Sequence, residues 1–164
     1  MGKNSEFKIR KATVKDVSEI LKLIKELADY ENLLKEVLTS EEQLKETLFG
    51  IKSTAEVILA VDKKRVLGFA LYFFSFSTFL GCPGIYLEDL FVRENERGRG
   101  IGKALLSNLA RRVKEVGGGR LDWSVLNWNK NAIDFYKKMG ANSLKEWTMY
   151  RLKGDKLSDL ADRG

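Results

Sequence analysis

The feature that most constrains this chain is a strand that leads through a glycine-rich, basic turn directly into a helix. The strand expected over Ile85–Val92 is apolar on both faces, which is typical of a strand buried on both sides. A helix is expected over 100–116, and glycine and arginine alternate just before it. Glycines let backbone amides turn toward one point, and a helix N-terminus adds free amides and a positive dipole end. The sequence therefore predicts a phosphate or pyrophosphate site.

The spacing of this turn excludes two common phosphate motifs. A P-loop needs Ser or Thr after Gly-Lys, but Ala104 follows Gly102 and Lys103. A dinucleotide fingerprint fails at its third small position in either register. The spacing that fits is Arg-x-x-Gly-x-Gly, filled by Arg97, Gly100 and Gly102, and it resembles the acyl-CoA pyrophosphate loop of the GNAT acetyltransferases. A glycine-rich turn without a ligand is the alternative.

The length of 164 residues predicts a single domain over 1–164, with a core of about 7–152 and a C-terminal tail over 153–164. No apolar run reaches the ~20 residues that cross a bilayer, so we expect no membrane partner. The first residues lack the apolar centre of a signal peptide. The one cysteine, Cys82, rules out an internal disulfide, and a reducing cytoplasm is expected.

The chain contains no histidine, and this removes several mechanisms together. Ser-His-Asp and Cys-His nucleophile systems are excluded, as are metal sites with histidine ligands. We expect no metal cofactor.

The net charge of +6 raises the possibility of nucleic-acid binding. The positive residues are, however, interleaved with acids along the expected helices, which indicates a solvated surface rather than a nucleic-acid interface. The excess charge would also attract a polyanionic cofactor.

The pattern of the whole chain predicts an α/β (α+β) fold with the order β-α-α-β-β-β-α-β-α-β. Strands are expected over 7–12, 56–62, 65–77, 85–92, 120–127 and 143–152. The first helix follows a capping box at 13–16 and carries an apolar stripe over 17–28. The second helix is capped by 39–42 and ends at Gly50, and the last two span 100–116 and 129–139.

Two carboxylates interrupt the apolar strand over Ile85–Val92. Side chains alternate along a strand, so Glu88 and Asp89 should point to opposite faces. Because burial of an unpaired carboxylate is costly, at least one should face a cavity or a partner. The alternatives are a β-bulge or an ion pair with Arg93 or Arg97.

The helix over 129–139 supplies a second set of candidates. From spacing alone, Tyr136 reads as a core residue with a satisfied hydroxyl, and catalysis is the less common role. Asn129 reads as a helix N-cap, and Trp128 as a packing residue.

Several blocks in order resemble one branch of the GNAT family, the diamine (spermidine/spermine) and thialysine N-acetyltransferases. The blocks lie at 9–13, 20–31, 68–73, 86–92, 128–129 and 135–141, within a resemblance that covers about 7–152. The resemblance implies a mixed, mostly antiparallel sheet splayed between its fourth and fifth strands. It also implies acetyl-CoA as cosubstrate, a small cationic amine as acceptor, and a homodimer.

The resemblance also implies roles for single residues. Tyr136 would be the general acid that protonates the departing thiolate, and Glu88 would take the amine proton through water. The cofactor-binding residues would be Leu90, Phe91, Val92, Arg97, Gly98, Arg99, Gly100, Ile101, Gly102, Lys103, Asn129, Lys130, Asn131, Ala132 and Tyr136. The acceptor-binding residues would be Tyr30, Glu31, Glu88, Asp89, Asp122, Trp123 and Ser124.

The chain departs from the diamine enzymes where the acceptor should bind. Asp122 stands in place of a histidine, and Thr148 in place of an acidic residue. The acceptor is therefore open among a diamine or polyamine, a thialysine-like amino acid and a protein lysine or N-terminus. A non-catalytic module that binds CoA or nucleic acid is the alternative from another class.

Overall fold

The computed structural model describes residues 7–63 and 65–163. They form two compact units, which divide between Ser124 and Val125 and are described separately here. The expectation of a single domain stays a prediction.

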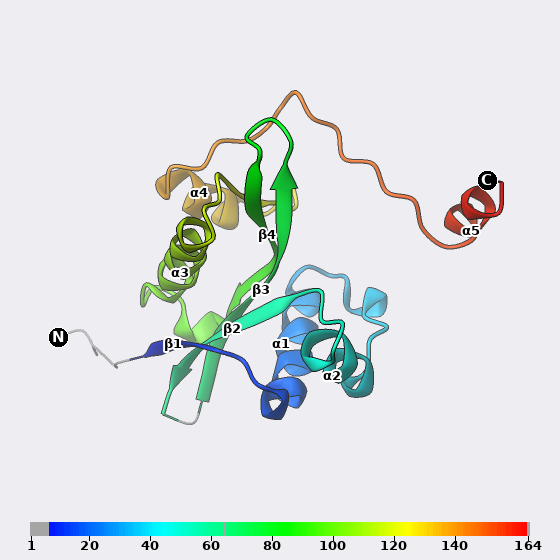
Figure 1. Ribbon diagram of the computed structural model, residues 1–164. Coiled ribbons are helices and arrows are strands. Elements are labelled where there is room, and N and C mark those ends of the chain that lie inside the picture. Colours follow the sequence, from blue (N-terminus) through cyan, green and yellow to red (C-terminus); the bar gives the residue numbers. More distant parts are fainter. Residues whose placement is uncertain (1–6, 64, 164) are drawn as a thin grey trace. The chain divides into compact units, whose positions relative to one another are not determined.

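The first unit is built on one five-stranded sheet in the order β1-β2-β3-β4-β5 (Figure 1). Its strands are β1 (Lys8–Lys11), β2 (Glu56–Asp62), β3 (Arg65–Ser77), β4 (Cys82–Val92) and β5 (Leu121–Trp123). The first four strands pair antiparallel, and β5 pairs parallel to β4. The mixed, mostly antiparallel sheet expected from the sequence is thereby confirmed.

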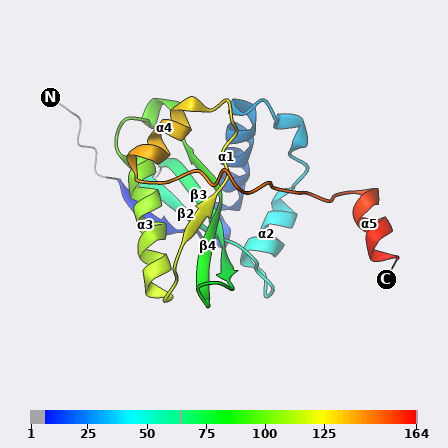
Figure 2. The ribbon, with the colours of Figure 1, turned by 90° about the horizontal axis from the view of Figure 1, so that it is seen from above.

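Helices cover both faces of this sheet (Figures 1 and 2). Its helices are α1 (Val17–Tyr30), α2 (Glu41–Phe49) and α3 (Ile101–Glu115), with short 3-10 turns η1 (Val14–Asp16), η2 (Leu34–Glu36) and η3 (Glu94–Glu96). α1 and α2 lie on one face, and α3 lies on the other.

The helix starts expected from the sequence are confirmed at atomic detail. The Ser40 hydroxyl accepts from the Gln43 amide at 3.2 Å, and the Gln43 side chain accepts from the Ser40 amide at 3.0 Å. The Asp16 carboxylate likewise accepts from the Thr13 amide at 2.7 Å, just before α1. The Ser40 pair caps α2, and the Thr13 pair caps η1, the 3-10 turn that leads into α1.

The core follows from the alternation of β2. Val57, Leu59 and Val61 are buried in one cluster with the apolar stripe of α1 and with α2. Ile58 and Ala60 are also buried but point to the opposite face, where α3 packs. Because β2 is buried on both faces, it lies in the interior of the unit.

The sheet opens beside the second half of β4. β5 is shorter than the expected 120–127 and pairs with β4 only over Ile85–Leu87. Beyond Leu87, β4 has β3 as its sole neighbour among the described strands. Leu71 pairs with Asp89 while Tyr72 pairs with Leu87, so Glu88 is the extra residue of a β-bulge. The open edge and the bulge therefore coincide.

The second unit contains α4 (Lys130–Lys138) and α5 (Asp155–Ala161). Asn129 caps α4, because its side-chain oxygen accepts from the Ala132 amide at 3.2 Å, as its position predicts. After α4, Gly140 adopts a φ of 88°, which a residue with a side chain would rarely take.

The final strand expected over 143–152 is wrong. Residues 142–153 lie in neither helix nor strand, and none of the described residues 125–163 forms a strand. A strand needs a hydrogen-bonded neighbour, and alternation in the sequence cannot supply one. The apolar side chains of this segment are exposed instead, with Tyr150 91% exposed.

Candidate functional site

The glycine-rich turn has the geometry of an anion-binding loop. Gly98 and Gly100 both adopt a φ of 79°, and no atom lies within 4 Å of a Cβ built on either. The backbone conformation therefore demands glycine, while the space around the turn stays open. Gly100 is the N-cap of α3 and offers no side chain, so the first amides of α3, at Ile101, Gly102 and Lys103, lack a capping acceptor. Such amides can bind a phosphate.

Arg99 anchors this loop through two acidic residues. Its guanidinium is ion-paired with Glu96 and lies 3.8 Å from the Asp62 carboxylate at the end of β2. Arg65 contacts the same two acids, at 3.3 Å from Glu96 and 3.6 Å from Asp62. The network ties the loop to the β2–β3 hairpin. Sequence reasoning missed it, because these four residues come from two separate parts of the chain.

Arg97 leaves the loop in another direction. Its Nε donates to the Val92 carbonyl oxygen at 3.0 Å. Its guanidinium carbon lies 4.7 Å from the centre of the Tyr30 ring and 5.9 Å from that of Phe91. Both distances fall within the range of cation–π contacts. The side chain thus reaches the end of β4 and the end of α1.

The open edge of β4 presents backbone groups for pairing. The Arg93 amide donates to Leu67 O in β3 at 2.9 Å. In an antiparallel pair, alternate residues direct their backbone groups to the partner strand, so Phe91 faces β3 while Leu90 and Val92 face the open edge. Two residues of this edge can therefore pair with an extended ligand.

Three carboxylates gather where the bulge meets the end of α1. Burial raises the pKa of Asp89 to about 7, and repulsion from Glu88 and then Glu31 adds to this rise. Burial also raises the pKa of Glu31, which follows directly on α1. Glu88, at the bulge, is exposed. The cluster has the chemistry of a cation-binding site.

The ion pairs considered from the sequence for Glu88 and Asp89 are not formed among the described residues. Arg93 binds Glu26 at 2.9 Å and Glu19 at 2.8 Å, both in α1. It therefore holds α1 on the sheet and does not pair with the acids of β4. The bulge, the other alternative, is confirmed.

The expected acceptor residues of β5 lie beside the first half of β4. Asp122 pairs with Tyr86, and its carboxylate accepts from Arg120 Nε at 2.8 Å. The hydroxyls of Ser124 and Tyr86 are 2.8 Å apart in a hydrogen bond that the sequence did not indicate. Trp123, opposite Leu87, is half-buried.

In the second unit, Asn129 is buried, while Lys130 and Asn131 are exposed and Ala132 is half-buried. The Tyr136 ring is half-buried, and its centre lies 5.3 Å from that of Phe135. The catalytic role of Tyr136 stays a prediction.

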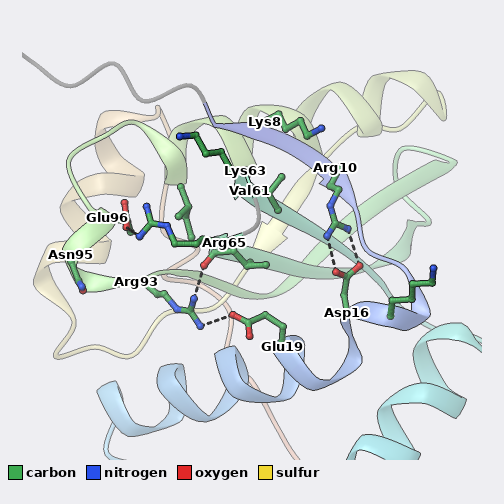
Figure 3. A pocket seen from close by; sticks show the side chains of 13 residues that line it. Lys8, Arg10, Asp16, Glu19, Val61, Lys63, Arg65, Arg93, Asn95 and Glu96 are labelled. Atoms are coloured by element: carbon green, nitrogen blue, oxygen red, sulfur yellow. Dashed lines mark hydrogen bonds and ion pairs between the residues drawn. The ribbon is translucent and has the colours of Figure 1, made fainter.

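A cavity of about 610 Å³ lies elsewhere in the first unit (Figure 3). Its lining contains none of the expected site residues. Two of its arginines form ion pairs with acids of the same lining: Arg10 binds Asp16 at 2.7 Å, and Arg93 binds Glu19 at 2.8 Å. We therefore locate the candidate site at the loop and the open edge of β4.

Comparison with known proteins shows the family. The sequence model of the acetyltransferase (GNAT) family matches residues 20–141. This chain belongs to the GNAT acetyltransferase family. The matched range contains the loop, the bulge and α4.

Relatives of this GNAT chain include named acetyltransferases of small amines. A thialysine N-epsilon-acetyltransferase of Mus musculus is 36% identical over 95% of this chain and 98% of its own length. An L-ornithine N5-acetyltransferase of Arabidopsis thaliana is 46% identical over 58% of this chain, but the match spans only 42% of that protein.

A solved structure has the same fold. An integron cassette protein from the mobile metagenome of V. cholerae superposes with a TM-score of 0.81 at 32% identity, over 94% of this chain and 97% of its own. Among the described residues, no helix has both the length and the apolar character of a membrane span. Among the same residues, no three His, Cys, Asp or Glu side chains, the carboxylates near β4 included, are placed so that they could hold one metal ion.

Proposed function

We propose that this protein transfers the acetyl group of acetyl-CoA to a primary amine of a small cationic acceptor, by direct transfer in a ternary complex. The observation that carries the proposal is the cluster of Glu31, Glu88 and Asp89 beside the open edge of β4. A positively charged acceptor would be drawn to these acids, next to a loop suited to a diphosphate.

The loop and the edge fit the cosubstrate. The uncapped amides at the start of α3 and the open space at Gly98 and Gly100 suit a diphosphate. The backbone groups of Leu90 and Val92 that face the open edge suit the amides of a pantetheine arm, which would bind as an added strand does. Asn129–Ala132 would line the cosubstrate further along.

The acids would prepare the amine. A primary amine has a pKa near ~10.4 and arrives charged at neutral pH, so it must lose a proton before it attacks. Glu88 would take this proton through water, while Asp89 and Glu31 hold the ammonium. Tyr30, Asp122, Trp123 and Ser124 would shape the rest of the acceptor site.

The remaining steps need a group that stabilises the oxyanion and a group that protonates the departing thiolate. Backbone amides on the open edge of β4 would stabilise the oxyanion that forms when the amine attacks the thioester. The Tyr136 hydroxyl would donate a proton to the departing thiolate. No covalent enzyme intermediate is required, which suits a chain with no histidine and one cysteine.

The direct test mixes protein and acetyl-CoA with single amines and measures the release of free CoA. The panel would contain L-ornithine, thialysine, spermidine, spermine and a lysine-containing peptide. We expect turnover with a small amine and little with the peptide. Release at the background rate with every amine would refute the proposal, and turnover confined to the peptide would favour a protein acetyltransferase.

We also propose that the protein works as a cytoplasmic homodimer. The family resemblance supports the dimer, and the free thiol of Cys82 suits a reducing compartment. Light scattering at micromolar concentration would give the mass of the assembly, and a monomer mass would refute the dimer.

A further inference from the structure

Within the described residues, the charge of Arg97 is not neutralised by a carboxylate. Among the described residues, no carboxylate forms an ion pair with it. Its contacts are a hydrogen bond to Val92 O at 3.0 Å, the stacking on Tyr30 at 4.7 Å and a longer cation–π contact with Phe91 at 5.9 Å. Arg99, two residues later, is instead paired with Glu96 and Asp62. The two arginines of the loop therefore do different work.

The contact with Tyr30 holds the end of α1. Tyr30 is the last residue of α1, and it packs against the hydrophobic core between this helix and the sheet. Helix ends fray unless a side chain or a neighbour holds them. Glu31 follows directly, and its carboxylate is close enough to repel that of Asp89. The position of the Glu31 carboxylate, one of the three acids near β4, thus depends on how firmly Tyr30 is held.

The hydrogen bond to Val92 links the same side chain to the open edge of β4. Val92 is one of the two residues whose backbone groups face that edge. The guanidinium of Arg97 therefore contacts both the Val92 carbonyl at the open edge of β4 and the Tyr30 ring at the end of α1. The backbone of Arg97 begins the glycine-rich loop.

We propose that Arg97 is a positioning residue that couples the diphosphate loop to the acceptor site by fixing Tyr30 and Glu31. This inference rests on the proposed function and extends it. A loop held in place by a bound diphosphate would also hold the Arg97 side chain, and through it the end of α1. Coupling between two sites is reciprocal, so CoA should raise the affinity for the amine by the factor with which the amine raises the affinity for CoA.

The rival role for Arg97 is that of a plain ligand of the diphosphate. In that case its removal would weaken the binding of CoA and leave the binding of the amine unchanged. A diphosphate ligand would change the Kd for CoA, whereas a positioning residue would change the KM for the amine. Calorimetry and kinetics can therefore separate the two roles.

The test compares Arg97→Met and Arg97→Lys with Arg111→Met as a matched control. Arg111 lies on the exposed side of α3, and its substitution removes the same charge without touching the loop. Lysine keeps the charge that attracts a diphosphate but lacks the Nε donor and the flat face. Thermal melting of each variant would verify folding before binding is measured.

We expect Arg97→Met to raise the KM for the best amine of the panel about tenfold, the size of one lost hydrogen bond plus a cation–π contact. Arg97→Lys should restore the affinity for CoA but not the KM for the amine. In the wild type, calorimetry of CoA with and without that amine should show the mutual enhancement, and Arg97→Met should abolish it.

A double-mutant cycle with Tyr30 would localise the effect. Tyr30→Leu removes the ring face, so it should raise the KM for the amine and add little when combined with Arg97→Met. Tyr30→Phe keeps the ring face, so the Arg97→Met effect should persist in that background.

Two outcomes would overturn the inference while leaving the proposed function intact. The first is a change in the affinity for CoA alone, with the KM for the amine unaltered by Arg97→Met. The second is full additivity of Arg97→Met and Tyr30→Leu. A wild type that binds no CoA and turns over no amine would instead refute the proposed function itself.

Discussion

Asp89 lies where folding alone would not place a carboxylate. It is paired with Leu71 on the sheet, it is half-buried, and two further acids repel its charge. Its pKa of about 7 means that the native state binds a proton more readily than the unfolded chain does. Stability is therefore lost as the pH rises from the unfolded pKa, near ~4, toward 7, and the loss is complete above about 7.

Asp89→Asn should stabilise the fold while it impairs function. The amide removes the cost of a buried charge, so the melting temperature should rise more at pH 8 than at pH 5, and turnover of the amine should fall. Asp29→Asn, on the exposed side of α1, is the control and should change the melting temperature equally at both pH values. Melting curves at the two pH values would decide, and an equal shift for Asp89→Asn would contradict the interpretation.

The same cluster predicts a pH profile. An amine cation binds best when the acids are ionised, so kcat/KM should rise with pH through an acid limb near the Asp89 pKa of about 7. Glu88→Gln removes the neighbour whose charge contributes most of the repulsion, and the limb should then move to lower pH. Its position can be read even if the rate falls. A limb that stays in place would separate Glu88 from the titration of Asp89.

The Tyr136 hydroxyl is the proton donor of the proposed mechanism. Tyr136→Phe keeps the ring and removes the proton donor, so kcat should fall about a hundredfold, as for the loss of a general acid. The affinity for CoA should stay within twofold in calorimetry. Phe135→Leu, which alters the neighbouring ring, is the control for packing. Unchanged kcat in Tyr136→Phe would remove this residue from the mechanism.

At the scale of elements, the sequence predicted those features whose cause is local. The bounds of β2 and β3, the cap of α2 and the glycine turn before α3 were correct because alternation, capping side chains and backbone conformation act within a few residues. The capping box at 13–16 was also correct, but it caps the 3-10 turn η1 that leads into α1. The short β5 and the absent last strand were missed, because strand pairing depends on partners that lie far along the chain. The cation–π contact of Arg97 with Tyr30 was missed for the same reason.

The glycine loop allows a sharp test at this scale. Gly100 and Gly117 bracket α3, both have positive φ, 79° and 67°, and neither has an atom within 4 Å of an added Cβ. Alanine at either position should therefore cost a similar ~1–2 kcal/mol of backbone strain. Calorimetry should show CoA binding weakened at least tenfold in Gly100→Ala and unchanged in Gly117→Ala. Equal binding in both variants would remove the loop from the CoA site.

At the scale of the whole molecule, the net charge is +6. The proposed cosubstrate is negatively charged and the proposed acceptor is positively charged. The net charge acts over the surface and is screened by salt, whereas Asp89 and Glu31 are half-buried and are screened less. The two substrates should therefore respond differently to ionic strength.

The KM for acetyl-CoA should rise several-fold between ~0.05 and ~0.5 M salt, and the KM for the amine should change less. Steady-state kinetics at both salt concentrations would measure this. Duplex DNA in a gel-shift assay at the higher salt should show no binding. If the KM for acetyl-CoA is insensitive to salt, the surface charge plays no part in its capture.

The bulge at Glu88 separates what the fold needs from what the chemistry needs. Without this residue, Leu87 and Asp89 would be consecutive, as are their partners Tyr72 and Leu71, so every other pair of the β3–β4 ladder would keep its register. A chain one residue shorter could thus build the same sheet with a straighter strand. In the mechanism proposed above, such a domain would keep its architecture but would lose the carboxylate that takes the proton of the amine.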